Sequence, residues 1–307
     1  MLLRIKFALL AGILLGSTAL TVDARGGTLR NGEQLRHSWI SQKEYARAKS
    51  SGLLFVSDFG NHVVDIFAAK NPKLPIGQVQ GLLSQPAALA VDKSDNLYVY
   101  DERGGYILEF KPPYTGPYVK RFSGFWGPAP SITVDSSGTL YIAASLNQVY
   151  EFPHGQTNGK GINLPVAPNG VTLDSSGNLV CTYNAAGAAG VFQLTKASRI
   201  PTNLLIPLEA SSADIAFDNS GNLVVEDSDG AYINVYPPGS TKPSKTFDDG
   251  FTNPNHMVFD SSRQHLYVSD YGNNTVKVIA YPSGTVQSQL TGFVNATGVA
   301  VSPAAIP

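Results

Sequence analysis

The sequence GVTLDSSGNLVCTYN at residues 170–184 is one of five similar segments that determine the fold. The other four are ALAVDKSDNLYVYD (88–101), SITVDSSGTLYIAAS (131–145), DIAFDNSGNLVVED (214–227) and HMVFDSSRQHLYVSD (256–270). Their first aspartates are spaced 43, 39, 44 and 42 residues apart, and a shorter copy, TGVAVSP (297–303), follows. Self-similarity at a period near 40 residues is typical of a repeat architecture.

Each repeat is expected to contain four short strands. Apolar alternation such as Leu89–Val91 precedes a D-x-S-G-N turn, and a second strand such as Leu97–Tyr100 follows. A third strand, for example Ile107–Phe110, leads through a Pro/Gly turn to a weaker fourth strand ending in Gly-Phe or Gly-Leu. Period-two alternation bounded by turn residues indicates strands. Four strands in each such period predict a β-propeller.

The two ends of the repeat region predict the number of blades and the closure of the ring. LLFVSD (53–58) matches a second strand, so the first unit lacks its first strand, whereas Gly298–Val301 is a first strand without a second. The C-terminal strand should therefore lie innermost in the blade that residues 53–83 begin. The sequence predicts an all-β, six-bladed propeller over residues 53–303, with a short tail at 304–307.

The N-terminal residues have the pattern of an export signal. Basic Arg4 and Lys6 precede the apolar run FALLAGILLGSTAL (7–20) and a small-residue site at Ala24. This pattern predicts a signal peptide over residues 1–24 and a secreted, periplasmic or extracellular protein. An uncleaved N-terminal anchor is the alternative. Residues 25–52 are polar and are expected to form a linker, either as a tether or with a short helix around Trp39–Ala48.

Composition excludes several classes of function. The chain of 307 residues has 22 basic and 23 acidic side chains, a net charge of −1. This balance argues against binding to nucleic acid or anionic lipid. A single cysteine, Cys181, excludes a disulfide scaffold, and we expect a buried thiol. No second long apolar stretch follows the signal, so we expect no membrane span after cleavage. We also expect a monomer.

The repeated polar residues are expected to have structural roles. The aspartates that end the first strands should accept backbone N–H groups in the following turns; they are Asp92, Asp135, Asp174, Asp218 and Asp260. The aspartates that end second strands should cap loops; they are Asp58, Asp101, Asp227 and Asp270. The Gly-Phe pairs, and Gly81-Leu82 as their variant, should pack between blades.

Units such as LAVDKSDNLYVYD and PNGVTLDSSGNLVCTYN resemble the NHL-type repeat of six-bladed propellers. They are also similar to the senescence-marker-protein/gluconolactonase group and to streptogramin-lyase-like propellers. The resemblance implies the fold and leaves the activity open, because such folds carry unrelated functions. In the lactonase group, Glu, Asn and Asp metal ligands stand five residues before the motif aspartate, and in amidating-type lyases zinc-binding histidines stand there.

The positions in that register predict the channel mouth of this chain. They are Ala87, Pro130, Asn169, Ala213, Asn255 and Thr297, of which Asn169 matches the lactonase asparagine. Asp214 and His256 stand one residue later, where the pleat should point them away from the channel unless a bulge restores them. None of the five histidines is in register, which excludes a three-histidine zinc site. We expect no cofactor and no metal site, with a weak divalent cation site such as Ca²⁺ as the alternative.

Trp126 is a further candidate ligand contact. It lies in KPPYTGPYVKRFSGFWGP (111–128), before the loop that leads into the channel. A sugar or peptide could stack on its ring, and packing of a longer outer strand is the alternative.

Two functions remain at this stage. The chain lacks the GxSxG, HExxH, P-loop and GxGxxG motifs. The favoured hypothesis is a secreted, non-enzymatic propeller whose loop face binds a protein, peptide or glycan. The alternative is a divergent metal-dependent lactonase or lyase-like hydrolase at the channel mouth. The candidate ligand-binding residues in either case are Asn169, Asp214, Asn255, His256, Thr297 and Trp126.

Overall fold

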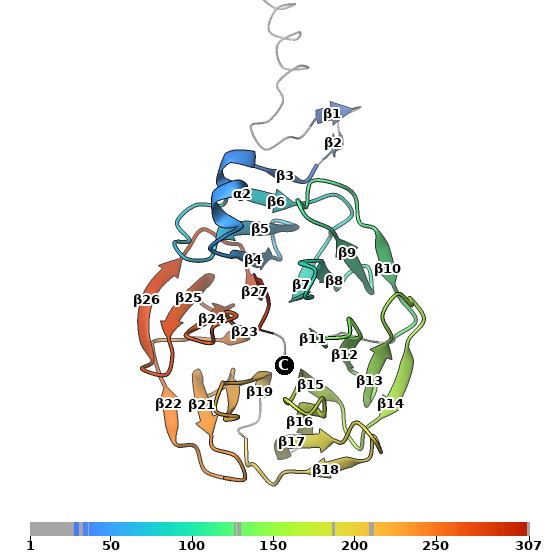
Figure 1. The fold of residues 1–307 in the computed structure, drawn as a ribbon, viewed down its shortest axis with the longest axis vertical. Coiled ribbons are helices and arrows are strands. Elements are labelled where there is room, and N and C mark those ends of the chain that lie inside the picture. The colour runs from blue at the N-terminus through green and yellow to red at the C-terminus, as the bar shows by residue number, and fades with distance from the viewer. Residues whose placement is uncertain are drawn as a thin grey trace, which may run out of the picture.

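The computed structural model describes residues 28–30, 33–35, 37–125, 127, 130–185, 188–208 and 212–305. From residue 39 onward the described strands form six antiparallel sheets, arranged as blades around a central channel (Figure 1). The predicted six-bladed propeller is confirmed.

The second to sixth blades each contain four consecutive strands, with the first strand nearest the channel. The second and third blades consist of β7 (Pro86–Val91), β8 (Leu97–Asp101), β9 (Tyr106–Phe110), β10 (Lys120–Phe122), β11 (Ser131–Val134), β12 (Leu140–Ala144), β13 (Gln148–Phe152) and β14 (Lys160–Asn163). The fourth to sixth blades consist of β15 (Pro168–Leu173), β16 (Leu179–Ala185), β17 (Ala188–Leu194), β18 (Pro201–Asn203), β19 (Ser212–Phe217), β20 (Leu223–Asp227), β21 (Tyr232–Tyr236), β22 (Lys245–Phe247), β23 (Pro254–Phe259), β24 (His265–Asp270), β25 (Thr275–Ala280) and β26 (Thr285–Leu290).

The first blade joins the two ends of the chain. Its strands are β27 (Ala296–Ser302), β4 (Leu53–Asp58), β5 (Val63–Ala68), β6 (Gly77–Val79) and β3 (Trp39–Ile40), in that order from the channel outward. Antiparallel pairing of Val299 with Val56 and of Val301 with Leu54 places the C-terminal strand innermost. The predicted closure of the ring is therefore confirmed.

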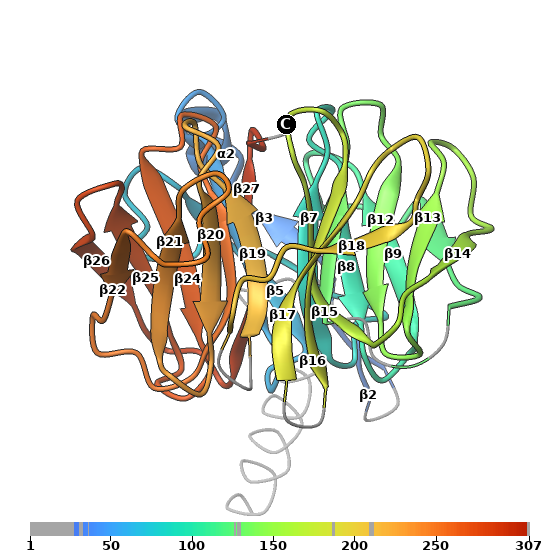
Figure 2. The same ribbon diagram turned by 90° about the horizontal axis from the view of Figure 1, so that it is seen from below.

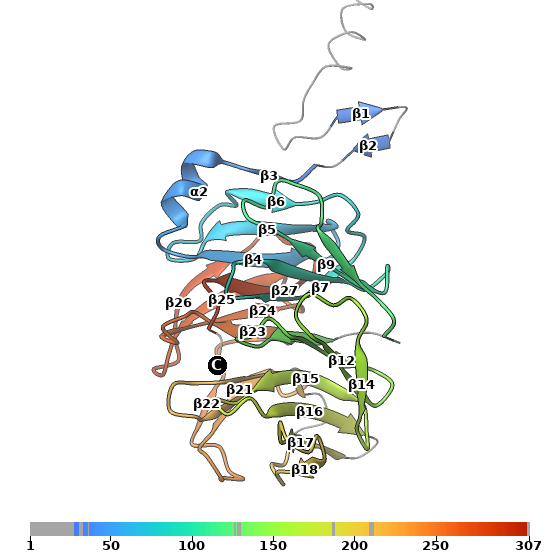
Figure 3. The ribbon, with the colours of Figure 1, turned by 45° about the vertical axis from the view of Figure 1, so that its right-hand side comes forward.

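The propeller extends further toward the N-terminus than the predicted start at residue 53. Strand β3 pairs with β6, and the indole of Trp39 donates to Oε1 of Gln78 at 3.2 Å. Helix α2 (Gln42–Ala48) is capped by the Ser41 hydroxyl and lies beside the first blade (Figure 3), where Ala48 is buried in the core. Residues 39–48 thus cover the outer edge of the first blade, and α2 corresponds to the short helix that was one of the two expectations for this stretch. Farther upstream, β1 (Thr28–Arg30) pairs with β2 (Glu33–Leu35), and the predicted signal peptide lies outside the described residues.

The hydrophobic core consists of layers between neighbouring blades. Phe125 packs against Tyr100 of the second blade and Tyr150 of the third, with ring centroids 6.0 and 6.2 Å apart. Phe293 packs on Phe67 of the first blade at 6.0 Å. The predicted packing role of these aromatics is confirmed. The Gly81-Leu82 variant differs, because Leu82 is 60% exposed and its neighbour Leu83 is buried instead.

The repeated aspartates stabilise turns and loops as predicted. Oδ1 of Asp174 accepts the backbone N–H groups of Ser176 and Asn178, both at 2.9 Å, and the first aspartates of the other repeats make equivalent bonds. Oδ1 of Asp270 accepts the N–H of Asn253 at 2.9 Å in the loop that enters its own blade. Cys181 is fully buried.

The propeller has two distinct faces. We call the loop face the side on which each first strand begins and each second strand ends. The turn face is the opposite side, where the D-x-S-G-N turns lie. After β27 the chain bends over the turn-face end of the channel (Figure 2), where Ala304 pairs with Asp260 and the Arg263 guanidinium donates to the carbonyl of Ala305. Within the described residues, no helix is long and apolar enough to span a membrane.

Candidate functional site at the channel mouth

Innermost strands carry a β-bulge close to the point where they begin. In β19 the register against β20 shifts between Ser212 and Ile215, and in β23 it shifts between Pro254 and His256. Strands β7, β15 and β27 contain equivalent shifts. A bulge inserts one residue into a strand, so the side chains near it change direction.

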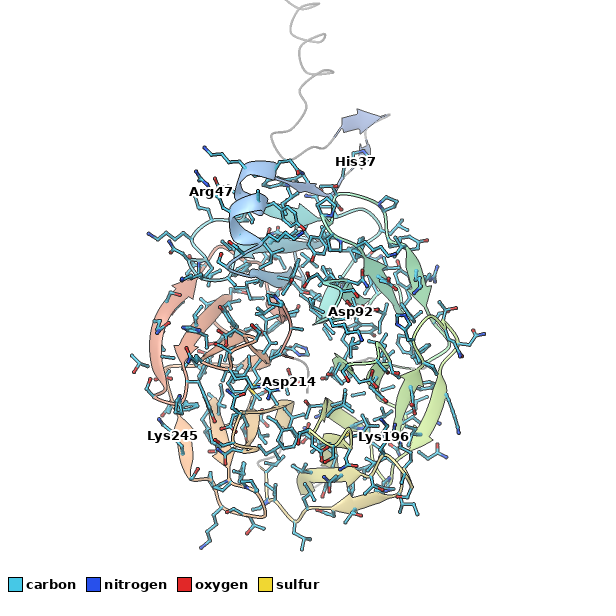
Figure 4. All side chains as sticks on the ribbon, viewed as in Figure 1. His37, Arg47, Asp92, Lys196, Asp214 and Lys245 are labelled. Atoms are coloured by element: carbon cyan, nitrogen blue, oxygen red, sulfur yellow. The ribbon has the colours of Figure 1, made fainter. Side chains whose placement is uncertain are left out.

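The bulges bring Asp214 and His256 to the channel. Both side chains are largely buried and line a central cavity of about 120 Å³ whose walls are otherwise mainly apolar. Figure 4 shows Asp214 near the centre of the ring, whereas Lys245 lies at its outer edge. A regular pleat was expected to point both residues away from the channel unless a bulge restored them, and both strands contain that bulge.

The Asp214 carboxylate connects several blades. Its Oδ1 accepts a hydrogen bond from the Ser131 hydroxyl at 3.1 Å, and its Oδ2 accepts from the backbone N–H of Met257 at 3.1 Å. Nδ1 of His256 lies 3.4 Å from the same Oδ2. Ser131 itself accepts from the N–H of Val171 at 3.2 Å. One buried carboxylate therefore joins the third, fifth and sixth blades directly and the fourth through Ser131.

A second carboxyl group, Glu226, lies directly behind Asp214. It is fully buried, and its Oε2 accepts the backbone N–H of Asp214 at 3.2 Å. The Ser228 oxygen lies 3.0 Å from Oε1 of Glu226 and 2.8 Å from the carbonyl oxygen of Pro254. A serine has one hydroxyl hydrogen and a carbonyl only accepts, so both contacts are satisfied together only when Glu226 carries a proton.

The electrostatic environment of Glu226 agrees with that geometry. Burial raises its pKa well above the ordinary value, and the negative charge of Asp214 raises it further. Hydrogen bonds that Ser228 and the Asp214 N–H donate to the ionised carboxylate lower the pKa, and their effect is smaller. Glu226 is thus a carboxylic acid that keeps its proton at a higher pH than a solvated glutamate.

Glu226 belongs to a ring of equivalent second-strand positions. The six residues, one in each blade, are Ser57, Tyr100, Ala143, Thr182, Glu226 and Ser269. Where the bulge removes a ladder partner, this side chain replaces it: Thr182 accepts the N–H of Gly170 at 2.7 Å, and Ser269 accepts that of His256 at 3.1 Å. Ser57 also donates to the Ala87 carbonyl of the next blade at 2.7 Å. The hydroxyl groups of Ser57, Thr182 and Ser269 thus hold bulges or link adjacent blades.

The remaining predicted site residues have other surroundings. The Thr297 hydroxyl donates to the Pro86 carbonyl of the next blade at 3.1 Å. Asn169 and Asn255 are half-buried residues within β15 and β23. Trp126 lies outside the described residues. Of the six predicted residues, the structure thus brings Asp214 and His256 into direct contact and uses Thr297 between blades.

These residues are poor ligands for a metal ion. Both Asp214 oxygens accept hydrogen bonds from protein groups, and burial raises the pKa of Glu226, which favours its neutral form. Among the residues that the structure describes, no group of three or more His, Cys, Asp or Glu side chains is arranged to hold a metal. The donor set does not fit the Glu, Asn and Asp centre that the lactonase resemblance implies.

Ser131, Glu226 and Ser228 were not predicted from the sequence. The available signal was the glutamate in LVVED (223–227), because the other repeats have Ser, Thr, Ala or Tyr at that position.

Comparison with known proteins identifies the class. No protein-family model and no curated protein matches the chain. A chain from the crystal structure of a nidogen/laminin complex aligns with a TM-score of 0.70 and 15% identity, covering 83% of this chain and 100% of its own. A protein of unknown function from Bacteroides caccae aligns with a TM-score of 0.66 and 11% identity, covering 82% and 98%. Streptogramin B lyase aligns with a TM-score of 0.50 and 14% identity, covering 67% and 68%.

These comparisons and the geometry define the chain as a six-bladed β-propeller. Identities of 11–15% show the fold alone. The neighbours include a propeller from a protein–protein complex and a lyase, and the NHL-type assignment stays a prediction.

Proposed function

We propose that this chain is an exported, non-enzymatic β-propeller that binds a partner protein or peptide through its loop face. The observation that carries the proposal is the contrast between two regions of that face. At the channel mouth, Asp214, His256 and Thr297 hold blades together. Around the mouth, the loops expose large apolar side chains, which are typical contributors to protein interfaces.

The exposed apolar residues come from neighbouring blades. Val294 precedes β27 and is 49% exposed, and Leu82 precedes β7 and is 60% exposed, so the two flank the first blade. A third exposed residue, Tyr271, lies between β24 and β25 on the sixth blade. Val294 is fixed in position, since its N–H donates to Asp58 at 2.9 Å and its carbonyl accepts from Gly60 at 2.7 Å. Rigid loops of this kind favour binding, because little ordering entropy is lost.

The test compares partner capture by matched variants. Purified protein is immobilised and exposed to an extract of the envelope and medium of the producing cells, and retained proteins are identified. The variant Val294→Asp should lose a protein that the wild type retains. Leu74→Asp is the control, because Leu74 is also strongly exposed but lies on the turn face. Equal retention by Val294→Asp, or retention of glycans in place of protein, would contradict the proposal.

The alternative is a lactonase or lyase-like hydrolase at the channel mouth. The contact of Asp214 with His256 beside a cavity favours it. A thermal melt in chelator and then in excess Ca²⁺, Zn²⁺ or Mn²⁺ separates the two functions. A metal at a hundred times its dissociation constant stabilises the native state by about 2.7 kcal/mol. We expect an unchanged midpoint, and a rise that Asp214→Ala abolishes would favour the enzyme.

The proposal also includes the cellular context that the sequence predicts. The chain acts after export, in the periplasm or outside the cell, as a monomer and without a resident cofactor. Cell fractionation of a tagged full-length chain, with the mass of the mature N-terminus, tests the location and the cleavage after Ala24 together.

A further inference from the structure

A second cavity, of about 470 Å³, lies between the fourth and fifth blades on the turn face. Its walls are mainly apolar and include Val180 and Ile206 of the fourth blade and Phe217 and Leu223 of the fifth. Asp174 lies at its edge, in the D-x-S-G-N turn of the fourth blade. This volume is in the range of cavities that bind small molecules.

The cavity coincides with a substitution in the repeat. Val180 follows Leu179 in β16, and the pairing register identifies the equivalent residue of every second strand. These residues are Phe55, Tyr98, Tyr141, Val180, Val224 and Tyr267 in the first to sixth blades. Four blades therefore have an aromatic ring at this position, and the fourth and fifth have valine.

Two of the three tyrosines at this position contact the turn aspartate of their own blade, whereas the hydroxyl of Tyr267 donates to the carbonyl of Ala69 at 3.1 Å. The hydroxyl of Tyr98 donates to Oδ2 of Asp92 at 3.1 Å, and its ring packs on Phe122 of the outer strand. The hydroxyl of Tyr141 lies 3.3 Å from Oδ2 of Asp135. In both blades the ring packs between the sheets while the hydroxyl reaches the turn.

The fifth blade restores the same arrangement with a residue of its neighbour. Tyr281 of the sixth blade donates its hydroxyl to Oδ2 of Asp218 at 2.6 Å. Its ring packs edge-on against Phe259 at 4.9 Å and Phe247 at 6.0 Å. A phenol group therefore accompanies the turn aspartate of the second, third and fifth blades, whereas in the sixth blade Nδ1 of His265 lies 2.8 Å from Oδ2 of Asp260.

In the fourth blade the ring of Tyr236 from the fifth blade lines the cavity, but among the described residues no phenol hydroxyl takes the place beside the turn aspartate. Oδ2 of Asp174 accepts amide hydrogens from Gln193 at 3.0 Å and from Asn178 at 2.8 Å. Gln193 also lines the cavity beside Val180. The cavity thus shares three features with the sites of Tyr98, Tyr141 and Tyr281: apolar walls, a position between two sheets, and an aspartate oxygen at the edge.

We propose that this cavity binds a small hydroxyaromatic compound. Its ring would lie between the fourth and fifth blades, and its hydroxyl would donate a hydrogen bond to Oδ2 of Asp174 in place of the Gln193 amide. The proposal is independent of the function proposed for the loop face, because the cavity opens on the other side of the ring.

The experiment measures binding of two matched probes by titration calorimetry. 4-Propylphenol has the ring and the donor, and 4-propylanisole replaces the hydroxyl hydrogen with a methyl group. We expect one bound phenol per chain and binding of the ether weaker by about tenfold, which corresponds to the loss of one hydrogen bond. Val180→Tyr rebuilds the arrangement of Tyr98 and should abolish binding while raising the melting temperature.

Two further variants complete the test. Val119→Tyr is the matched control, since Val119 is exposed near the outer edge of the second blade and the variant should bind like the wild type. Ile206→Phe fills the cavity from the segment that follows β18 and replaces Val180→Tyr if that variant does not fold. Equal affinity for phenol and ether, or unchanged binding in both cavity-filling variants, would overturn the proposal.

Discussion

Ser131 and Asp214 stand 83 residues apart in sequence, yet the hydroxyl of Ser131 donates to Oδ1 of Asp214 at 3.1 Å. The serine begins the first strand of the third blade, and the aspartate lies in the bulge of the fifth. The fourth blade, which lies between the third and the fifth, also takes part, because the N–H of its Val171 donates to the same hydroxyl at 3.2 Å. The pair therefore ties three blades together where the channel meets the loop face.

Removal of the Asp214 carboxylate should destabilise the ring. In Asp214→Ala the Ser131 hydroxyl and the Met257 N–H lose their acceptor in a buried place, which costs about 1–3 kcal/mol for each group left unpaired. Unfolding by urea should show this loss, while capture of a loop-face partner should persist. In a double-mutant cycle with Ser131→Ala, the two changes should couple by about 0.5–3 kcal/mol. Strict additivity would show that the pair does not act as a unit.

The raised pKa of Glu226 predicts a loss of stability as the pH rises. The folded state holds the Glu226 proton above the pH at which the unfolded chain releases it. The contribution of Glu226 to the free energy of unfolding is therefore fully present below the ordinary glutamate pKa. It is lost as the pH rises through the pKa that Glu226 has in the folded state. The slope for one proton is about 1.4 kcal/mol per pH unit.

Glu226→Gln should remove that pH dependence. A glutamine can accept from the Asp214 N–H and donate to Ser228, as the protonated acid does, so the fold is retained. The free energy of unfolding should then vary less between pH 5 and pH 9 than in the wild type. Asp227→Asn is a useful comparison, since this neighbour caps the N–H of Gly230 at 2.7 Å in the adjacent loop. A variant Glu226→Gln with the wild-type slope would contradict the protonated state.

The blade count and the closure could be predicted from sequence because both depend on local signals. The period, the turn residues and the strand alternation recur within each repeat, so errors in one copy are corrected by the others. The orientation of Asp214 could not be predicted in the same way. A shift of one residue reverses every side chain of a strand, and the bulge in β19 depends on contacts with Glu226 in the neighbouring strand.

Contacts between distant segments were likewise not evident in the sequence. Glu226 resembles an ordinary strand residue until Ser228 and the Pro254 carbonyl are placed beside it. The docking of residues 39–48 depends on the free edge of β6, to which Trp39 and Ile40 pair. The polar residues before the first repeat show no periodicity that would predict pairing with this strand edge.

A methyl group at Gly298 should disrupt the closing blade. A β-carbon at this position would overlap the carbonyl oxygen of Ala87 in the first strand of the next blade. Because that obstacle is backbone, relief requires movement of a blade, and overpacking of this kind costs about 1–3 kcal/mol or more. Gly298→Ala should lower the urea midpoint accordingly. Gly116→Ala is the control, since a β-carbon there meets no atom within 4 Å. Equal midpoints for the two variants would mean that the first and second blades are not in this close contact.

The single thiol should be inert in the native protein. Cys181 lies in the middle strand β16 with no exposed surface, and burial raises its pKa to about 12. At pH 8 almost no thiolate exists, and the reagent has no access, so both conditions for reaction are absent. Ellman's reagent should therefore label Cys181 only at the rate at which the fourth blade opens, and at once in guanidinium chloride. As a control, Ser283→Cys in a Cys181→Ala background places a thiol on an exposed turn and should react immediately. Rapid labelling of native Cys181 would show that β16 is accessible, which the packing of this blade does not allow.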